Sequence, residues 1–169
     1  MRCGFSFSLV KNSNFDYKFP FFRIFEFEKF ESKNHLNTYK NLENLKIEPF
    51  SIKHIEDVTS IHSKVLDGWS MKGLIGDLAN QSTESYVAVY EGRALGFCSF
   101  IATEDAELVF ICTPPLCRRQ GVGEKLLREA IVALPKTVNS IVLEVRSQNE
   151  PAIKMYEKMG FVTLGKRKN

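Results

Sequence analysis

The chain has 169 residues, of which 44% are hydrophobic and 25% are charged, and its formal net charge is +3 at pH 7. This length and composition fit one globular domain, and the positive charge is too weak to support a nucleic-acid partner. No apolar run is long enough to cross a membrane, so we expect no membrane partner. The four cysteines lack metal-type spacing. They predict no metal site and reduced thiols in a cytoplasmic protein.

The first 44 residues differ from the rest of the chain. Nine of the 14 phenylalanines lie between Phe5 and Phe30, interleaved with charged residues. The stretch 19–27 partly alternates, which is compatible with a strand, with a docked hydrophobic strap, or with no fold at all. Lys11 interrupts the first apolar stretch and no small-residue cleavage site follows, so we do not interpret it as a signal peptide. We therefore expect residues 1–44 to be an extension of unknown structure and residues 45–169 to be the domain.

From Leu45 onward the pattern becomes regular. Apolar residues at helical spacing follow Ser51, which is a suitable helix cap, and a second helical pattern follows Ser70. Glu91 and Gly92 form a hairpin-turn pair between two apolar runs. In chain order the expected elements are a strand at 46–50, helices after Ser51 and Ser70, strands at 85–90, 94–102 and 107–112, a helix at 124–133, a strand at 141–145, a helix at about 149–159 and a short strand at 161–164.

The strand at 107–112 leads into a glycine-bearing loop at the start of a helix. The loop reads Arg118-Arg119-Gln120-Gly121-Val122-Gly123. Backbone N–H groups at such a loop and the positive end of the helix dipole converge on one anion. The two glycines let a phosphate approach the backbone, and the arginines can add charge-assisted contacts. The segment therefore predicts a phosphate-binding site, although a surface turn with a basic patch stays open from the loop alone.

Two common phosphate loops do not fit this segment. The dinucleotide fingerprint needs three glycines, and a Walker loop needs Lys followed by Ser or Thr where this chain has Glu124. The remaining pattern, Arg-x-x-Gly-x-Gly after a strand, resembles the pyrophosphate loop of the GCN5-related N-acetyltransferases (GNAT), which bind acetyl-coenzyme A. By this resemblance acetyl-CoA is the co-substrate, and its expected contacts are Ile111, Cys112, Thr113, Arg118, Arg119, Gln120, Gly121, Val122, Gly123, Glu124 and Asn149.

A second block supports the same family. Leu-Glu-Val-Arg-Ser-x-Asn at 143–149 precedes Lys-x-Tyr-Glu-Lys-x-Gly-Phe at 154–161 and Gly-Lys-Arg-Lys-Asn at 165–169. This wording is similar to the RimI type, the bacterial ribosomal-protein-alanine N-acetyltransferases, as is Gly-Trp-Ser at 68–70. The resemblance implies an α+β fold with a mixed, mostly antiparallel sheet that splits at the cofactor site between flanking helices. It also implies a further strand after residue 169, so we expect an open sheet edge beside the Phe161 segment and weakened acceptor binding.

The resemblance assigns the chemistry to two residues. Glu144 matches the general base that takes a proton from the acceptor amine, and it lies among apolar strand residues. Tyr156 matches the general acid for the leaving thiolate. From the residues alone, a solvent-facing acid and a core tyrosine stay open. Asn149 is first a helix cap and, by resemblance, also a cofactor contact.

The resulting functional prediction is acetyl transfer from acetyl-CoA to a protein N-terminal α-amine. By resemblance the acceptor is the N-terminal alanine of a small-subunit ribosomal protein. Two alternatives stay open: an acetyltransferase for a small amine or a lysine side chain, and a truncated domain that binds acetyl-CoA without turnover.

Overall fold

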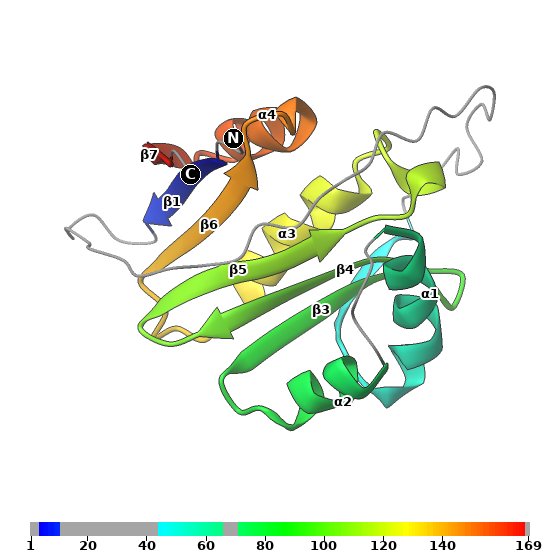
Figure 1. The fold of residues 1–169 in the computed structure, drawn as a ribbon. Helices are drawn as coiled ribbons and strands as arrows, with labels where there is room; N and C mark the ends of the chain where they lie inside the picture. The colour runs from blue at the N-terminus through cyan, green and yellow to red at the C-terminus, as the bar shows by residue number, and fades with distance from the viewer. Residues whose placement is uncertain (1–3, 11–43, 66–70, 168–169) are drawn as a thin grey trace.

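The computed structural model describes residues 4–10, 44–65 and 71–167. These residues form one seven-stranded sheet in the order β2-β3-β4-β5-β6-β1-β7 (Figure 1). Neighbouring strands are antiparallel except β5 and β6, which are parallel, so the mixed and mostly antiparallel sheet is confirmed. The strands are β1 Gly4–Val10, β2 Lys46–Pro49, β3 Thr83–Tyr90, β4 Arg93–Ala102, β5 Asp105–Cys112, β6 Ser140–Arg146 and β7 Val162–Arg167.

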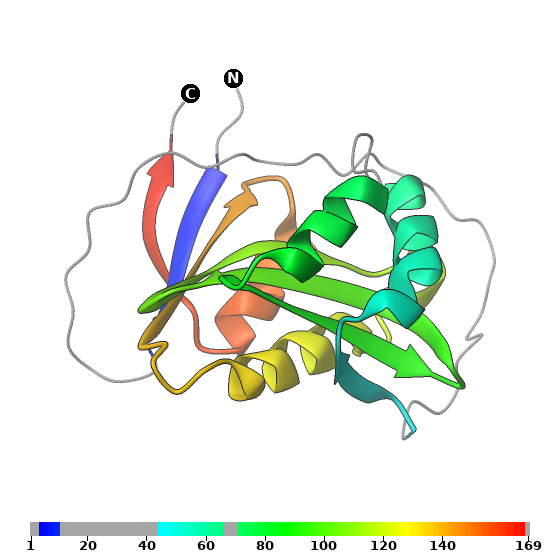
Figure 2. The same cartoon turned by 90° about the horizontal axis from the view of Figure 1, so that it is seen from below.

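The helices lie on both faces of this sheet. They are α1 Ile55–Val65, α2 Met71–Ala79, α3 Val122–Ala133 and α4 Glu150–Lys158, with short 3-10 turns at Ile52–His54 and Pro115–Cys117. Figure 2 shows α1 and α2 on one face and α3 and α4 on the other. One buried cluster lies on the α3 side and includes Leu126, Leu143 and Phe161. A smaller cluster lies on the α1 side and includes Val58 and Phe97.

The first helix follows the expected pattern with one exception. Ser51 caps its start, and Ile55, Val58 and Ile61 are buried, as their spacing predicts. Ile52, expected on the same apolar face, is 79% exposed. The reason is that the helix opens with a 3-10 turn, whose tighter winding turns Ile52 away from the face that the α-helix buries. The expected cap Ser70 and the Gly-Trp-Ser stretch lie outside the described residues.

The sheet splits between β5 and β6. The two strands pair only from Asp105 opposite Ser140 to Leu108 opposite Leu143, and then diverge (Figure 1). In the pairing of β5 with β4, Phe100 lies opposite Leu108 and Ser99 opposite Phe110, so β5 carries a bulge at Val109. A bulge bends the strand that carries it. The split predicted by the family resemblance is confirmed, and the last residues of β5 and β6 do not pair with each other.

The N-terminal strand changes the expected edge of the sheet. β1 lies between β6 and β7 and pairs antiparallel with both. The expectation of an open edge beside the Phe161 segment is therefore corrected for one side only: β1 pairs along one side of β7, and the other side of β7 is the edge of the sheet. The sequence Gly-Phe-Ser-Phe-Ser-Leu-Val alternates apolar and small residues, which suits a strand with one buried face. The stretch 19–27 lies outside the described residues, and the domain boundary at residue 45 stays a prediction.

Candidate functional site

A cleft of about 640 Å³ occupies the split between β5 and β6. A cavity of this size is typical of a small-molecule or cofactor site. Four segments line it: the end of β5, the loop before α3, the end of β6 and the first turns of α4. The predicted site residues that line it are Ile111, Cys112, Thr113, Arg118, Arg119, Gly121, Gly123, Glu124, Glu144, Asn149 and Tyr156. Residues far apart in the sequence are thus brought to one cavity.

The loop before α3 presents backbone donors to this cleft. Gly121 has φ 85° and ends the loop in the left-handed region, which glycine adopts without strain. The first helical bond runs from the Lys125 N–H to the Gly121 carbonyl at 2.9 Å. The N–H groups of the three residues before Lys125 therefore have no carbonyl within the helix to bind, and they make the positive end of its dipole. This geometry suits a phosphate, as the sequence predicts.

Gly123 leaves room for a ligand at the same place. A Cβ built at Gly123 would lie 3.7 Å from Thr113 Cγ2 and 3.9 Å from Met155 Sδ. Both of these residues line the cleft. A larger side chain at Gly123 would therefore enter the space between β5 and α4. The glycine therefore keeps this part of the cleft open.

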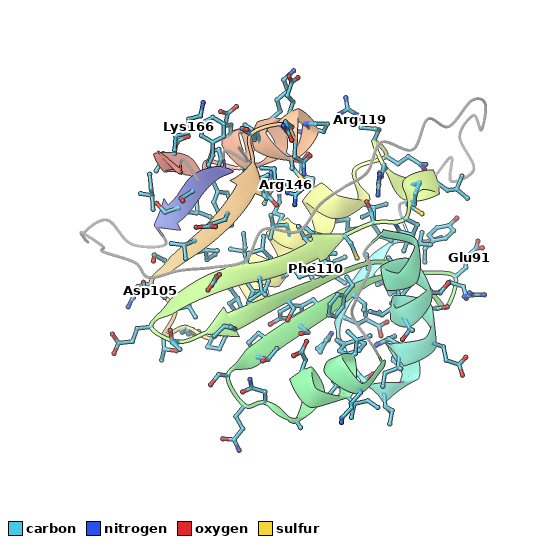
Figure 3. The ribbon with its side chains drawn as sticks, in the orientation of Figure 1. Glu91, Asp105, Phe110, Arg119, Arg146 and Lys166 are labelled. Carbon is cyan, nitrogen blue, oxygen red and sulfur yellow. The ribbon has the colours of Figure 1, made fainter. Side chains whose placement is uncertain are left out.

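Positive side chains predominate around the loop. Arg118 Nε donates to the Thr113 carbonyl at 3.3 Å, and burial lowers the pKa of its guanidinium, which keeps its charge at neutral pH. Figure 3 shows Arg119 on this loop and Arg146 on β6. The Glu124 carboxylate lies 2.8 Å from Lys158 and 3.1 Å from Arg128. The hydrogen bond from Lys158, which has the larger effect, and the one from Arg128 lower the pKa of the Glu124 carboxyl. The bond from Lys158 also joins α3 to α4.

Two predicted contacts have side chains outside the cleft lining. Gln120 Nε2 donates to the Leu116 carbonyl at 2.6 Å, and Val122, the first residue of α3, is 1% exposed in the core. Neither residue lines the cleft. Asn149 lines the cleft and also caps α4, because its side chain accepts a hydrogen bond from the Ala152 N–H at 3.4 Å. The cap is confirmed, and the cofactor contact of Asn149 stays a prediction.

Glu144 follows Leu143, the last residue of β6 that pairs with β5. Leu143 and Val145 are buried on the α3 side of the sheet, and Glu144 lies on the opposite face, as expected. It lines the cleft, and its Oε2 atom is buried. A carboxylate at this place can reach a group that enters the cleft.

Tyr156 combines the two interpretations that the sequence left open. It is 4% exposed and its ring lies 6.1 Å from the ring of Phe7 and 5.6 Å from that of Phe161, so it is a core residue. It also lines the cleft. Burial, which has the larger effect, and the nearby Cys98 thiol raise the pKa of the Tyr156 phenol well above the usual value. The phenol therefore keeps its proton at neutral pH and can act as a hydrogen-bond donor.

Glu107 is a residue that sequence reasoning missed. It lies on β5 opposite Val142, two positions before Glu144 on the neighbouring strand and on the same face. Burial, and to a smaller extent the charge of Glu144, together raise the pKa of Glu107 to about 7. An acidic residue inside the apolar run Ala-Glu-Leu-Val-Phe was the available signal, but its pairing with β6 could not be read from the sequence. Two carboxyl groups thus share the face beside the cleft.

The described ranges hold no group of three or more His, Cys, Asp and Glu side chains placed to bind a metal ion. Within the same part of the chain, no helix is long and apolar enough to cross a membrane.

Comparisons with known proteins agree with this geometry. Residues 40–161 match the model of the acetyltransferase (GNAT) family. A Bacillus subtilis protein, provisionally named a ribosomal protein bS18-alanine N-acetyltransferase, is 28% identical over 137 residues, which cover 79% of this chain and 88% of that protein.

Two solved structures share the fold. The ribosomal-protein-S18-alanine N-acetyltransferase of Escherichia coli superposes with a TM-score of 0.62 at 26% identity, over 70% of this chain and 77% of that one. AAC(6')-Iy in complex with the bisubstrate analog CoA-S-monomethyl-acetylneamine gives a TM-score of 0.62 at 19% identity, over 70% and 90% of the two chains.

Proposed function

This chain belongs to the acetyltransferase (GNAT) family, and from that premise we propose that it acetylates the α-amine of a protein N-terminus. The family model and the relatives named N-acetyltransferases identify it as an acetyltransferase, and the family uses acetyl-CoA. The proposed acceptor is the N-terminal alanine of a small-subunit ribosomal protein. It is supported by two relatives that are named for ribosomal protein bS18-alanine or S18-alanine acetylation. A cytoplasmic location is part of the same proposal.

The observation that carries the proposal is the lining of one cleft. The phosphate loop lies at one part of it, and Glu144 and Tyr156 lie on the strand and helix at another. Anion-binding N–H groups, a carboxylate and a phenol are the three kinds of group that acetyl transfer to an amine requires. Their meeting in a single cavity of cofactor size supports an enzyme over a domain that only binds acetyl-CoA.

Each side chain has a defined role in the proposed reaction. When bound, acetyl-CoA supplies a thioester carbonyl for attack by the amine. The loop N–H groups, Arg118 and Arg119 hold its phosphates. Glu144 takes the proton from the acceptor, which is needed because an α-ammonium has a pKa of about 8 and is mostly charged at neutral pH. The Tyr156 hydroxyl donates a hydrogen bond toward the leaving thiolate, and its raised pKa favours donation over loss of the proton.

A small-amine acceptor is a second candidate. Glu107 and Glu144 lie on one face of neighbouring strands and interact electrostatically. Two carboxyl groups beside the cleft would favour an acceptor with several positive charges. A protein N-terminus carries one such charge, so the two acceptor classes differ in how much they depend on Glu107.

The test is a comparison of acceptors with the full chain. Rates of coenzyme A release are measured at saturating acetyl-CoA with three acceptors: a peptide that begins with alanine, its N-terminally blocked form carrying an internal lysine, and a small polyamine. The proposal expects the highest kcat/KM for the free α-amine peptide and none above background for the blocked one. A preference for the polyamine would support the second candidate. Binding of acetyl-CoA without turnover on any acceptor would leave only a binding domain.

A further inference from the structure

The N-terminal strand β1 is an interior strand of the sheet. It pairs with β6 from Gly4 opposite Arg146 to Val10 opposite Ser140, and with β7 from Gly4 opposite Arg167 to Ser8 opposite Val162. β6 and β7 do not pair with each other. The residues on one side of the cleft are therefore held in place by a strand that is 130 residues away in sequence, since β6 begins at Ser140 and β1 ends at Val10.

The two faces of β1 differ in chemistry. Phe5 and Phe7 lie opposite Val145 and Leu143 on the buried α3 side, and Phe7 is 1% exposed. Ser6 lies directly opposite Glu144, and Ser8 lies directly opposite Val142. Directly opposite residues on antiparallel strands share a face and have Cβ atoms about 4.5–5.5 Å apart. A serine hydroxyl of β1 is thus the cross-strand neighbour of the proposed general base.

We propose that Ser6 of β1, one strand beyond the residues that line the cleft, contacts the acceptor substrate beside Glu144. This inference rests on the proposed acetyl transfer and deepens it. Glu144 lines the cleft from β6, and β1 is the next strand on the side of β6 away from β5. An acceptor whose amine reaches Glu144 and whose chain extends away from β5 therefore passes Ser6. Ser6 is half-buried there, and its hydroxyl can both donate and accept a hydrogen bond.

The register of β1 fits this role. A slip of one residue would exchange the two faces of the strand and place Phe side chains beside Glu144. The Phe7 ring opposes such a slip, because it is held in the core against Tyr156. The apolar residues of β1 therefore set the register, and the small polar residues between them leave room for a substrate.

The experiment compares Ser6→Ala with Ser8→Ala in the full chain. Both serines lie on the same face of the same strand, but only Ser6 is opposite Glu144. Loss of one hydrogen bond to the acceptor is expected to raise the acceptor KM about threefold to tenfold in Ser6→Ala. The Kd for acetyl-CoA and the kcat should stay near those of the parent, and Ser8→Ala should match the parent throughout. Equal acceptor KM values for both variants and the parent would overturn the contact.

A second measurement tests the strand without any turnover. Hydrogen exchange of the parent should show the backbone amides of residues 5–9 protected to the same degree as those of 141–145, because both strands are interior. Fast exchange in residues 5–9 would overturn the proposal whatever the activity. A protected β1 in a protein that acetylates no amine would instead contradict the proposed function, and the two failures are distinguishable.

Discussion

The ring of Phe7 packs 6.1 Å from the ring of Tyr156, so a residue of the first strand supports a proposed catalytic residue on the last helix. Both side chains are almost completely buried, at 1% and 4% exposure. Tyr156 also packs on Phe161, which lies just before β7. The aromatic cluster joins β1, α4 and the start of β7. The stability of the fold and the position of the phenol therefore depend on the same contact.

Phe7→Ala is expected to lower the free energy of unfolding by about 3–5 kcal/mol, which is the usual cost of removing a buried phenylalanine ring. Phe5→Ala is the matched control, because Phe5 lies on the same face of β1 but is only half-buried. Its effect should be clearly smaller. Urea unfolding of both variants measures the difference. Equal losses would mean that Phe7 does not have the core position described above.

Tyr156→Phe is expected to lower kcat while the melting temperature and the Kd for acetyl-CoA stay near the parent values. The substitution keeps the ring that packs on Phe7 and removes only the hydroxyl. Tyr86→Phe serves as control, since Tyr86 is also buried but its hydroxyl donates to Glu84 at 3.3 Å and it does not line the cleft. Steady-state kinetics of both variants measure the change in kcat. A Tyr156→Phe enzyme with parental kcat would make Tyr156 a packing residue alone.

Glu144→Gln is expected to reduce kcat by about a hundredfold, the usual loss when a general base is removed. The reduction should be largest near pH 7, where the acceptor amine is mostly protonated, and smaller at pH 9. Affinity for acetyl-CoA should be retained, because the amide keeps the size of the side chain. A pH–rate profile of the variant parallel to that of the parent would show that Glu144 does not take the proton.

Gly123→Val is expected to abolish the stabilisation of the folded chain by acetyl-CoA. The parent should gain about 2.7 kcal/mol at a ligand concentration near 100 Kd. A valine at this position would extend between Thr113 and Met155, where the cleft is narrow. Gly76→Val in α2 is the control, since a Cβ there meets no atom within 4 Å. Thermal unfolding with and without acetyl-CoA provides the readout. An undiminished shift in Gly123→Val would place the cofactor elsewhere.

Glu107 makes the stability of the folded chain depend on pH. The pKa of Glu107 is raised from 4.5 to about 7 in the folded chain. Between pH 4.5 and about 7, Glu107 holds a proton in the folded state that it has lost in the unfolded state. The contribution of Glu107 to the free energy of unfolding is therefore fully present below about pH 4.5 and is lost as the pH rises through about 7. The melting temperature of the parent should therefore fall more between pH 5 and pH 8 than that of Glu107→Gln.

Glu144→Gln supplies a second check on the same pair. Removing the charge of Glu144 should shift the pH range of this loss to lower values, because burial alone then raises the pKa of Glu107. Identical pH dependence of stability in the parent and in Glu107→Gln would contradict the raised pKa.

The local parts of this molecule could be predicted from the sequence. The loop around Gly121 and the cap at Asn149 depend on residues within one turn of each other, and both occur as expected. The family resemblance predicted the split sheet. The pairing of β1 with β6 and β7 could not be predicted, because it joins residues from opposite ends of the chain and the period of a strand does not name its partner. Glu107 was missed for the same reason, since its pKa depends on burial and on a neighbour across the split.

The most direct test of acetyl transfer at this cleft locates the transferred group. The full chain is incubated with isotopically labelled acetyl-CoA and one peptide that has an N-terminal alanine and an internal lysine, and fragment mass spectra assign the label. The account predicts label on the α-amine in the parent, and at least about a hundredfold less in Glu144→Gln. Label on the lysine alone, or equal labelling by the parent and Glu144→Gln, would contradict it.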